Sequence, residues 1–285
     1  MNTGIDHRHL YSAVKINAKY QLEGGCPSFT QGTGFIVACE GNEHVGIVSN
    51  RHILDRTWLE PLWHGASLEL TIDVWVNRTT KKTYRISPLR TYSHADESVD
   101  VAVIPVDRFH REDMPDSPVY LRSALPWEFL MKAQDDWHLL EPSETVFFSG
   151  YPEWYDRSAG RPIMRTGAIV SDPQYDYRYT EGPPTNEDGN RQILFEAFSS
   201  SGNSGSPVFV AQRGLPSSDH IKYNGVFHPS LLVGINAGHI PIRNPVEDRQ
   251  GNIHLTHWHV GLSRMFKVSA IIDVVRDMAE RHEWS

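Results

Sequence analysis

The chain has 285 residues, a length that favours about two folding units, each large enough to bury a core of its own. Its 39% hydrophobic and 22% charged residues exclude a disordered chain and a highly charged coiled coil. A formal net charge of −8 argues against a protein that binds nucleic acid mainly through positive charge.

Neither membrane insertion nor export is indicated by the sequence. Uninterrupted apolar runs are too short to span a bilayer, and residues 1–19 lack the apolar core of a secretory signal. We therefore expect a cytoplasmic protein. The two cysteines, Cys26 and Cys39, are expected to be free thiols in a reducing compartment, although a disulfide would form if the fold brought them together.

Short strands separated by turn residues dominate the first 110 residues. Leu68–Val76 alternates apolar and polar side chains, which is the period of a strand with one buried face. The same pattern, or a denser apolar run, recurs along this half. The predicted strands are residues 14–19, 34–38, 45–49, 68–76, 83–87 and 101–106.

The second half repeats this count. Its predicted strands are residues 145–149, 163–170, 193–197, 207–210, 231–237 and 257–263. The intervening residues 107–142 are rich in Pro, Asp and Glu and indicate a connection with one short helix near 127–134. After Lys267 the apolar residues follow the spacing of one helix face.

These elements predict an all-β protein of two six-stranded antiparallel β-barrels with a C-terminal α-helix. The predicted divisions are an N-terminal barrel at 10–110, a linker at 111–142, a C-terminal barrel at 143–266 and a helix at 267–285.

The most informative string for chemistry is Gly202-Asn203-Ser204-Gly205-Ser206-Pro207. Glycines on both sides of one serine permit a tight turn that exposes its hydroxyl and points backbone N–H groups into one concavity. Acyl transfer needs this combination of a nucleophile and donors for an oxyanion. A flexible loop rich in Gly and Ser is the alternative interpretation.

A serine nucleophile needs a base, and the base needs an orienting carboxylate. His52 follows the apolar strand predicted at 45–49, and Asp100 opens the apolar run 101–106. A carboxylate in that position is expected to be partly buried and hydrogen-bonded. Taken singly, a strand-end histidine, a turn aspartate and a loop serine each have a purely structural explanation.

Four motifs follow one another along the chain: Gly32–Val37, Ser49–His52, Asp100–Val103 and Gly202–Pro207. In this order they resemble the chymotrypsin-like (trypsin-like) serine peptidases, most closely bacterial Deg-type and glutamyl-endopeptidase-like members. The resemblance implies that Ser204 attacks the scissile carbonyl, His52 transfers the proton and Asp100 orients the imidazole. It also implies an oxyanion hole made by the N–H groups of Gly202 and Ser204, with no metal or organic cofactor.

Two departures from the family pattern concern activation. Many secreted members carry, before the nucleophile, an aspartate that pairs with a newly cleaved N-terminus, and here that residue is the uncharged Asn203. We therefore expect no activation by N-terminal insertion. No peptide-binding domain is recognised after the second barrel, unlike in the Deg-type proteins, so we expect no self-assembly through one.

Substrate contacts are expected from two segments. Asn236, Ala237 and Gly238 resemble the strand that pairs with substrate and walls the specificity pocket, while Phe198 and Ser199 fall near its floor. Acid-specific relatives have a histidine at the position of Asn236, and trypsin-like specificity would need an acidic floor. The sequence therefore predicts preference for a neutral polar or apolar side chain.

Other candidate residues carry weaker signals. His254, His257 and His259 could bind zinc, but no thiol or carboxylate partner accompanies them, so no metal is expected. His44 and His94 lack the flanking motif of His52.

The sequence thus predicts a bacterial cytoplasmic serine endopeptidase that acts on a specific protein or peptide substrate, with a possible regulatory protein partner. Neither a nucleic acid nor a membrane is expected as a partner. The alternative is a catalytically silent or latent module that binds peptides or regulates a partner.

Overall fold

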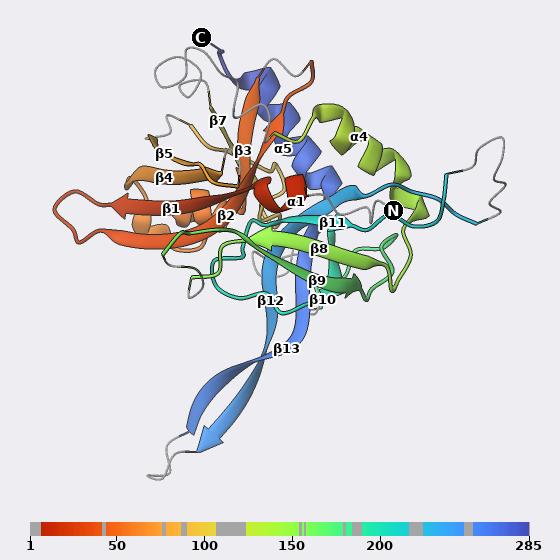
Figure 1. The fold of residues 1–285 in the computed structure, drawn as a ribbon. Coiled ribbons are helices and arrows are strands. Elements are labelled where there is room, and N and C mark those ends of the chain that lie inside the picture. Colours follow the sequence, from red (N-terminus) through yellow and green to blue (C-terminus); the bar gives the residue numbers. More distant parts are fainter. Residues whose placement is uncertain are drawn as a thin grey trace.

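The computed structural model describes residues 7–41, 44–75, 78–86, 90–106, 124–153, 156, 158–178, 181–183, 190–216, 225–247 and 253–284. The strands form an N-terminal sheet and a C-terminal barrel, and helices pack between and beside them (Figure 1). Among the described helices, none is long and apolar enough to cross a membrane.

The N-terminal unit is a seven-stranded antiparallel sheet in the order β5-β4-β1-β2-β3-β7-β6. Its strands are β1 (Ala13–Gln21), β2 (Ser28–Ala38), β3 (Val45–Ser49), β4 (Ser67–Trp75), β5 (Lys81–Ile86), β6 (Tyr92–Ser93) and β7 (Ala102–Pro105). Over the described residues this sheet does not close, so the prediction of a six-stranded barrel is wrong here. The two edge strands do not pair with each other, because the two-residue β6 pairs only with β7.

The C-terminal unit is a closed barrel in the order β10-β13-β12-β11-β8-β9, which confirms the six predicted strands. Its strands are β8 (Thr145–Gly150), β9 (Ile163–Ile169), β10 (Gln192–Glu196), β11 (Pro207–Val210), β12 (Leu231–Glu247) and β13 (Ile253–Lys267). Strands β12 and β13 are longer than predicted, and they continue past the barrel as a two-stranded arm (Figure 1).

Short helices precede β1 and follow β3 in the first unit. They are α1 (His7–Tyr11), α2 (Arg51–Leu54) and the 3₁₀ turns η1 (Arg56–Trp58) and η2 (Pro61–Trp63). Two further elements lie in the predicted linker, α4 (Trp127–Asp135) and η4 (Asp136–Leu139). This part of the linker is tied to the sheet, because the N–H of Leu125 donates to Ile36 O at 2.8 Å and Leu125 O accepts from Ala38 N–H at 2.9 Å.

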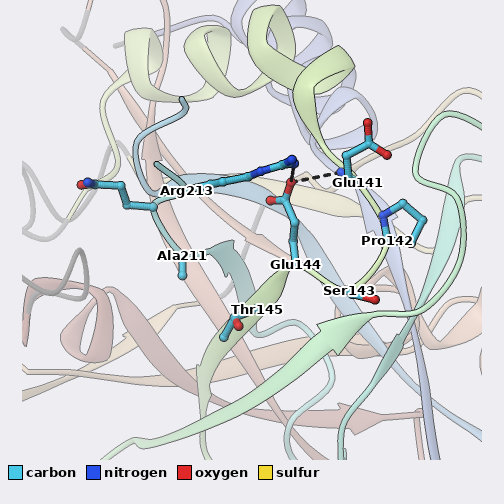
Figure 2. A pocket seen from close by; sticks show the side chains of 8 residues that line it. Glu141, Pro142, Ser143, Glu144, Thr145, Ala211 and Arg213 are labelled. Carbon is cyan, nitrogen blue, oxygen red and sulfur yellow. Dashed lines mark hydrogen bonds and ion pairs between the residues drawn. The ribbon is translucent and has the colours of Figure 1, made fainter. Parts of the chain in front are cut away.

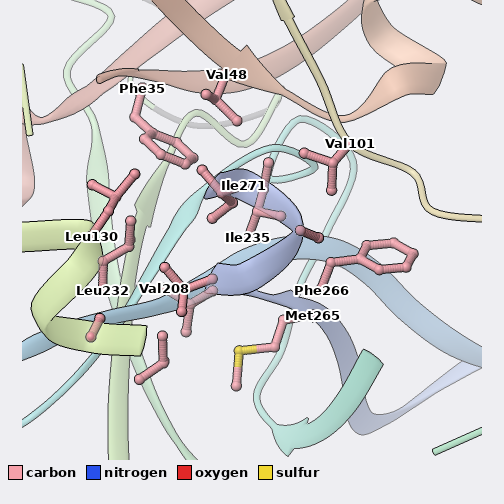
Figure 3. Close-up of a cluster of buried hydrophobic side chains, with 14 of the residues drawn as sticks. Phe35, Val48, Val101, Leu130, Val208, Leu232, Ile235, Met265, Phe266 and Ile271 are labelled. Carbon is pink, nitrogen blue, oxygen red and sulfur yellow. The ribbon is translucent and has the colours of Figure 1, made fainter. Parts of the chain in front are cut away.

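The C-terminal helix α5 (Val268–Arg281), predicted from its apolar spacing, fills the space between the two units. It contacts β3 and β7 of the sheet, β12 and β13 of the barrel, and α4. Ile271 lies in one buried cluster with Phe35 of the sheet and Val208 and Leu232 of the barrel (Figure 3). Helix α5 therefore completes a core shared by both units.

We expect Ile271→Ala to lower the free energy of unfolding by about 2 to 5 kcal/mol, because it leaves a cavity in this shared core. Ile271 is 0% exposed, whereas Glu280 of the same helix is exposed and serves as the control. Denaturant unfolding of Ile271→Ala and Glu280→Ala checks this prediction. Equal stability of the two variants would contradict it.

Candidate active site

His52 and Asp100 come together because of strand pairing. Strands β3 and β7 are antiparallel neighbours, with Ser49 opposite Ala102. His52 follows Ser49 by three residues and Asp100 precedes Ala102 by two, so both lie at the same end of the strand pair. The chain then turns into α2, which carries His52 on its second residue.

The carboxylate of Asp100 is held on both oxygens. Oδ2 lies 2.6 Å from His52 Nδ1, and Oδ1 accepts the backbone N–H of His52 at 2.9 Å. Asn50 Nδ2 donates to the carbonyl oxygen of Asp100 at 2.8 Å. Asp100 is 2% exposed, so an ionised carboxylate here depends on these donors. The contact assigns the proton to Nδ1 and leaves Nε2 of His52 as the atom able to accept one.

Ser204 lies in a tight turn between two glycines with positive φ, Gly202 at 89° and Gly205 at 88°. A Cβ on Gly205 would lie 1.9 Å from Thr33 O, so only glycine fits there. The carbonyl of Ser204 accepts Thr33 N–H at 2.8 Å, and Ser49 Oγ donates to Thr33 O at 2.6 Å. The Ser204 turn therefore rests on β2 and on the end of β3, the strand that leads to His52.

The described contacts include no hydrogen bond between Ser204 Oγ and the ring of His52. Such bonds are often long in unliganded enzymes and tighten with substrate. Within the described part of the chain, the N–H groups of Gly202 and Ser204 likewise have no acceptor. The arrangement thus offers a hydroxyl, an oriented imidazole and two available backbone donors, which together suit acyl transfer.

The residues predicted for the specificity pocket lie in different environments. Phe198 is 63% exposed, so its side chain lies on the surface and forms no buried floor. Ser199 and Asn236 are buried, and Asn236 Nδ2 donates to Ser199 Oγ at 2.8 Å. Ala237 is also buried, and Gly238 has positive φ with open space around its Cα.

Thr33 and Asn50 were not among the predicted site residues, although both lie inside the motifs that carried the resemblance. Both are 0% exposed and polar, and each bonds to a residue of the site. The sequence signal that could have identified them is their position, because each is a polar residue directly beside a strand that is predicted to be buried.

The competing histidines have other contacts. His94 is buried, its Nδ1 accepts Asp96 N–H, and burial together with the nearby Arg191 lowers its pKa. His44 stacks on the Trp284 ring. The side chains of His254, His257 and His259 lie outside the described residues. Both cysteines are free in the structure, Cys26 exposed and Cys39 buried.

A cavity of about 350 Å³ lies apart from these residues, between the start of β8 and the end of β11 (Figure 2). In it Glu144 accepts from Arg213 Nη1 at 2.9 Å and, on its other oxygen, lies 2.7 Å from Nε2 of the buried His228. Burial of the His228 ring acts to lower its pKa, but the contact with Glu144 and the hydrogen bond to Pro229 O outweigh burial and raise that pKa. Bonds from His228 and Arg213 lower the pKa of Glu144 despite its burial.

Comparison with known families adds one finding. A family model described as "Trypsin-like peptidase domain" matches residues 32–215, about two thirds of the chain. The matched segment contains His52, Asp100 and Ser204. No curated protein matches the chain.

We expect Gly205→Ala to lower the free energy of unfolding by about 3 kcal/mol or more, since it combines positive φ with a clash against Thr33 O. Gly24 is the matched control, with φ at 70° and no heavy atom within 4 Å of an added methyl group. Gly24→Ala should cost only about 1 to 2 kcal/mol. Denaturant unfolding of both variants tests the close approach, and equal losses would count against it.

The His228–Glu144 contact predicts a pH window of stability. The pKa of His228 is raised above its ordinary value of 6.5. The stability that this residue contributes to the fold is therefore fully present below pH 6.5 and is lost as the pH rises through the raised pKa. The pKa of Glu144 is lowered below its ordinary value of 4.5. The stability that this residue contributes to the fold is therefore fully present above pH 4.5 and is lost as the pH falls through the lowered pKa.

We therefore expect His228→Gln to cost about 2 kcal/mol between about pH 4.5 and 6.5, and less on either side. Urea unfolding of wild type and variant across pH 3.5 to 9 (roughly the range that brackets both groups) measures the difference. A loss that does not vary with pH would rule out the charged contact.

Proposed function

The chain belongs to the trypsin-like peptidase domain family, and from that membership we propose that it is a serine endopeptidase working through a Ser-His-Asp triad. The family supports a peptidase hydrolase. The observation that carries the finer assignment is the buried carboxylate of Asp100, held by the ring and the backbone N–H of His52. Such a carboxylate fixes the imidazole in one tautomer and stabilises its protonated form.

The proposed reaction uses the groups of this chain alone. Ser204 Oγ attacks the scissile carbonyl while His52 Nε2 accepts its proton, and the oxyanion forms against the N–H groups of Gly202 and Ser204. His52 then protonates the leaving amine, which departs and leaves an acyl-enzyme. Water attacks the ester in a second round, with His52 as base again, and releases the acid and free Ser204.

Several finer features belong to the proposal. Likeness to Deg-type and glutamyl-endopeptidase-like members remains an interpretation of the motifs. A neutral side chain is the proposed specificity, with Phe198 as an exposed apolar contact and Ala237 and Gly238 as backbone partners of the substrate. The physiological target is proposed to be a specific protein, and the cytoplasmic and bacterial assignments stay predictions.

A second candidate, a latent or silent module, has the same set of described contacts as the active enzyme. The described contacts join His52 to Asp100 but do not join Ser204 to His52, so two of the three catalytic groups are bonded. In a latent protease a partner or substrate would complete the third contact.

The test is intact mass after treatment with a serine-reactive fluorophosphonate, for wild type and Ser204→Ala. We expect one adduct on wild type and none on the variant, because only an activated serine displaces fluoride at a useful rate. Both proteins should unfold at similar denaturant concentration, since Ser204 is only partly buried. Equal labelling of both proteins would contradict Ser204 as nucleophile, and labelling of neither would favour the silent module.

A further inference from the structure

Asn236 has an environment unlike that of a pocket residue. It is 0% exposed, and both donors of its amide are used, one to Ser199 Oγ and one to Asn203 O, each at 2.8 Å. Its Oδ1 accepts Gly238 N–H at 3.3 Å. Turning this amide toward a substrate would break buried hydrogen bonds, each of which is costly to leave unmade.

Its backbone holds the same turn. Asn236 N–H donates to Ser206 O, and Asn236 O accepts Gly205 N–H, both at 2.9 Å. Main chain and side chain of this one residue therefore contact Asn203, Gly205 and Ser206, which surround the nucleophile. The turn is fixed to β12 on both sides of Ser204.

The bond to Asn203 O has a direct consequence for the oxyanion hole. A peptide unit is planar and trans, so its C=O and N–H point in opposite directions. The unit that carries Asn203 O also carries the N–H of Ser204. Asn236 Nδ2 at 2.8 Å and Ser206 N–H at 3.1 Å both hold that oxygen, and they thereby direct the Ser204 N–H away from them.

The second oxyanion donor is oriented in the same way from another element. The unit that carries the N–H of Gly202 carries Ser201 O, which accepts Glu153 N–H at 3.2 Å. Thr33 Oγ1 holds the next carbonyl, Gly202 O, at 2.7 Å. Each peptide unit from Ser201 to Ser204 thus has its carbonyl bound, and neither Gly202 nor Ser204 donates its N–H within the described residues.

We propose that Asn236 is a positioning residue that orients the Ser204 N–H for the oxyanion, and that it does not read the substrate side chain. The inference rests on the proposed function, because it assigns a role at the same site. Every group in this arrangement is neutral. Asn203, buried beside it, donates Nδ2 to Ser200 Oγ at 3.1 Å and supplies no charge either. Among the described residues, the hydrogen bonds that orient the two N–H groups come from neutral groups.

The test uses Asn236→Leu, which keeps the size of the side chain and removes both donors. Ser199→Ala is the comparison, because it removes the other acceptor of the amide and keeps the bond to Asn203 O. Steady-state kinetics are measured on peptide amides that differ only in the residue before the scissile bond. Circular dichroism checks folding, and Asn236→Ala replaces the leucine variant if that variant does not fold.

We expect Asn236→Leu to lower kcat about 10-fold to 100-fold, somewhat less than deletion of an oxyanion donor, with KM and the ranking of substrates unchanged. Ser199→Ala should lose less kcat than Asn236→Leu. An altered substrate ranking with a changed KM would make Asn236 a specificity residue and overturn the inference. So would wild-type turnover with an unchanged kcat in the variant. A wild type without turnover or labelling would instead remove the proposed function, and this inference with it.

Discussion

Thr33 is the residue on which the arrangement of the two units at the site depends. It is 0% exposed and uses every polar group it has: its N–H donates to Ser204 O, its Oγ1 donates to Gly202 O and accepts Tyr151 N–H, and its carbonyl accepts Ser49 Oγ. These contacts join β2 to β3, to the end of β8 and to the Ser204 turn. Together with the core that α5 completes, this connection fixes the support of Ser204 on the barrel relative to the support of His52 on the sheet.

The glycines near Thr33 follow from that connection. Backbone can approach backbone this closely only where no Cβ intervenes. A Cβ on Gly205 would meet Thr33 O, and a Cβ on Gly202 would lie 2.3 Å from Tyr151 O. The first of these approaches joins the two units and the second lies within the C-terminal unit, so the glycines around the serine reflect tertiary contacts as well as the local turn. The glycines of this six-residue motif are therefore required by residues that lie far away in the sequence.

Much of the fold was predictable where local pattern and tertiary environment agree. Strands β3 and β11 match their predicted bounds, because each is a short, mainly apolar run that is buried on both faces. The amphipathic α5 was predictable for the same reason. The two-residue β6 and the missing closure of the sheet were not, since pairing between distant edges leaves no periodic signal. The arm of β12 and β13 extends beyond the apolar residues that marked these strands.

The site divides in a similar way. Sequence order and flanking residues brought out His52, Asp100 and Ser204, whose neighbours are constrained by the strands that carry them. Asn236 was predicted as a pocket wall, and the structure shows its amide buried and fully bonded. The side chain of a polar residue in an apolar strand can point to either face of the strand. The acceptors of the two Asn236 amide donors lie 37 and 33 residues away along the chain. The direction of its two amide donors therefore depends on tertiary contacts that no local pattern records.

The bonding of the site is also uneven, and this bears on how activity is controlled. The Asp100–His52 pair and the carbonyls of Ser201, Gly202 and Asn203 are bound by fixed donors, whereas Ser204 Oγ and the N–H groups of Gly202 and Ser204, the proposed oxyanion donors, have no partner among the described residues. Groups that must meet a substrate are available, and those that must not move are held. The groups that bond to the Ser204 turn are neutral amides, hydroxyls and carbonyls. A change of pH therefore does not directly alter these hydrogen bonds. Control of this protein would then act on access to the site or on the Ser204–His52 contact, and not on assembly of the oxyanion hole.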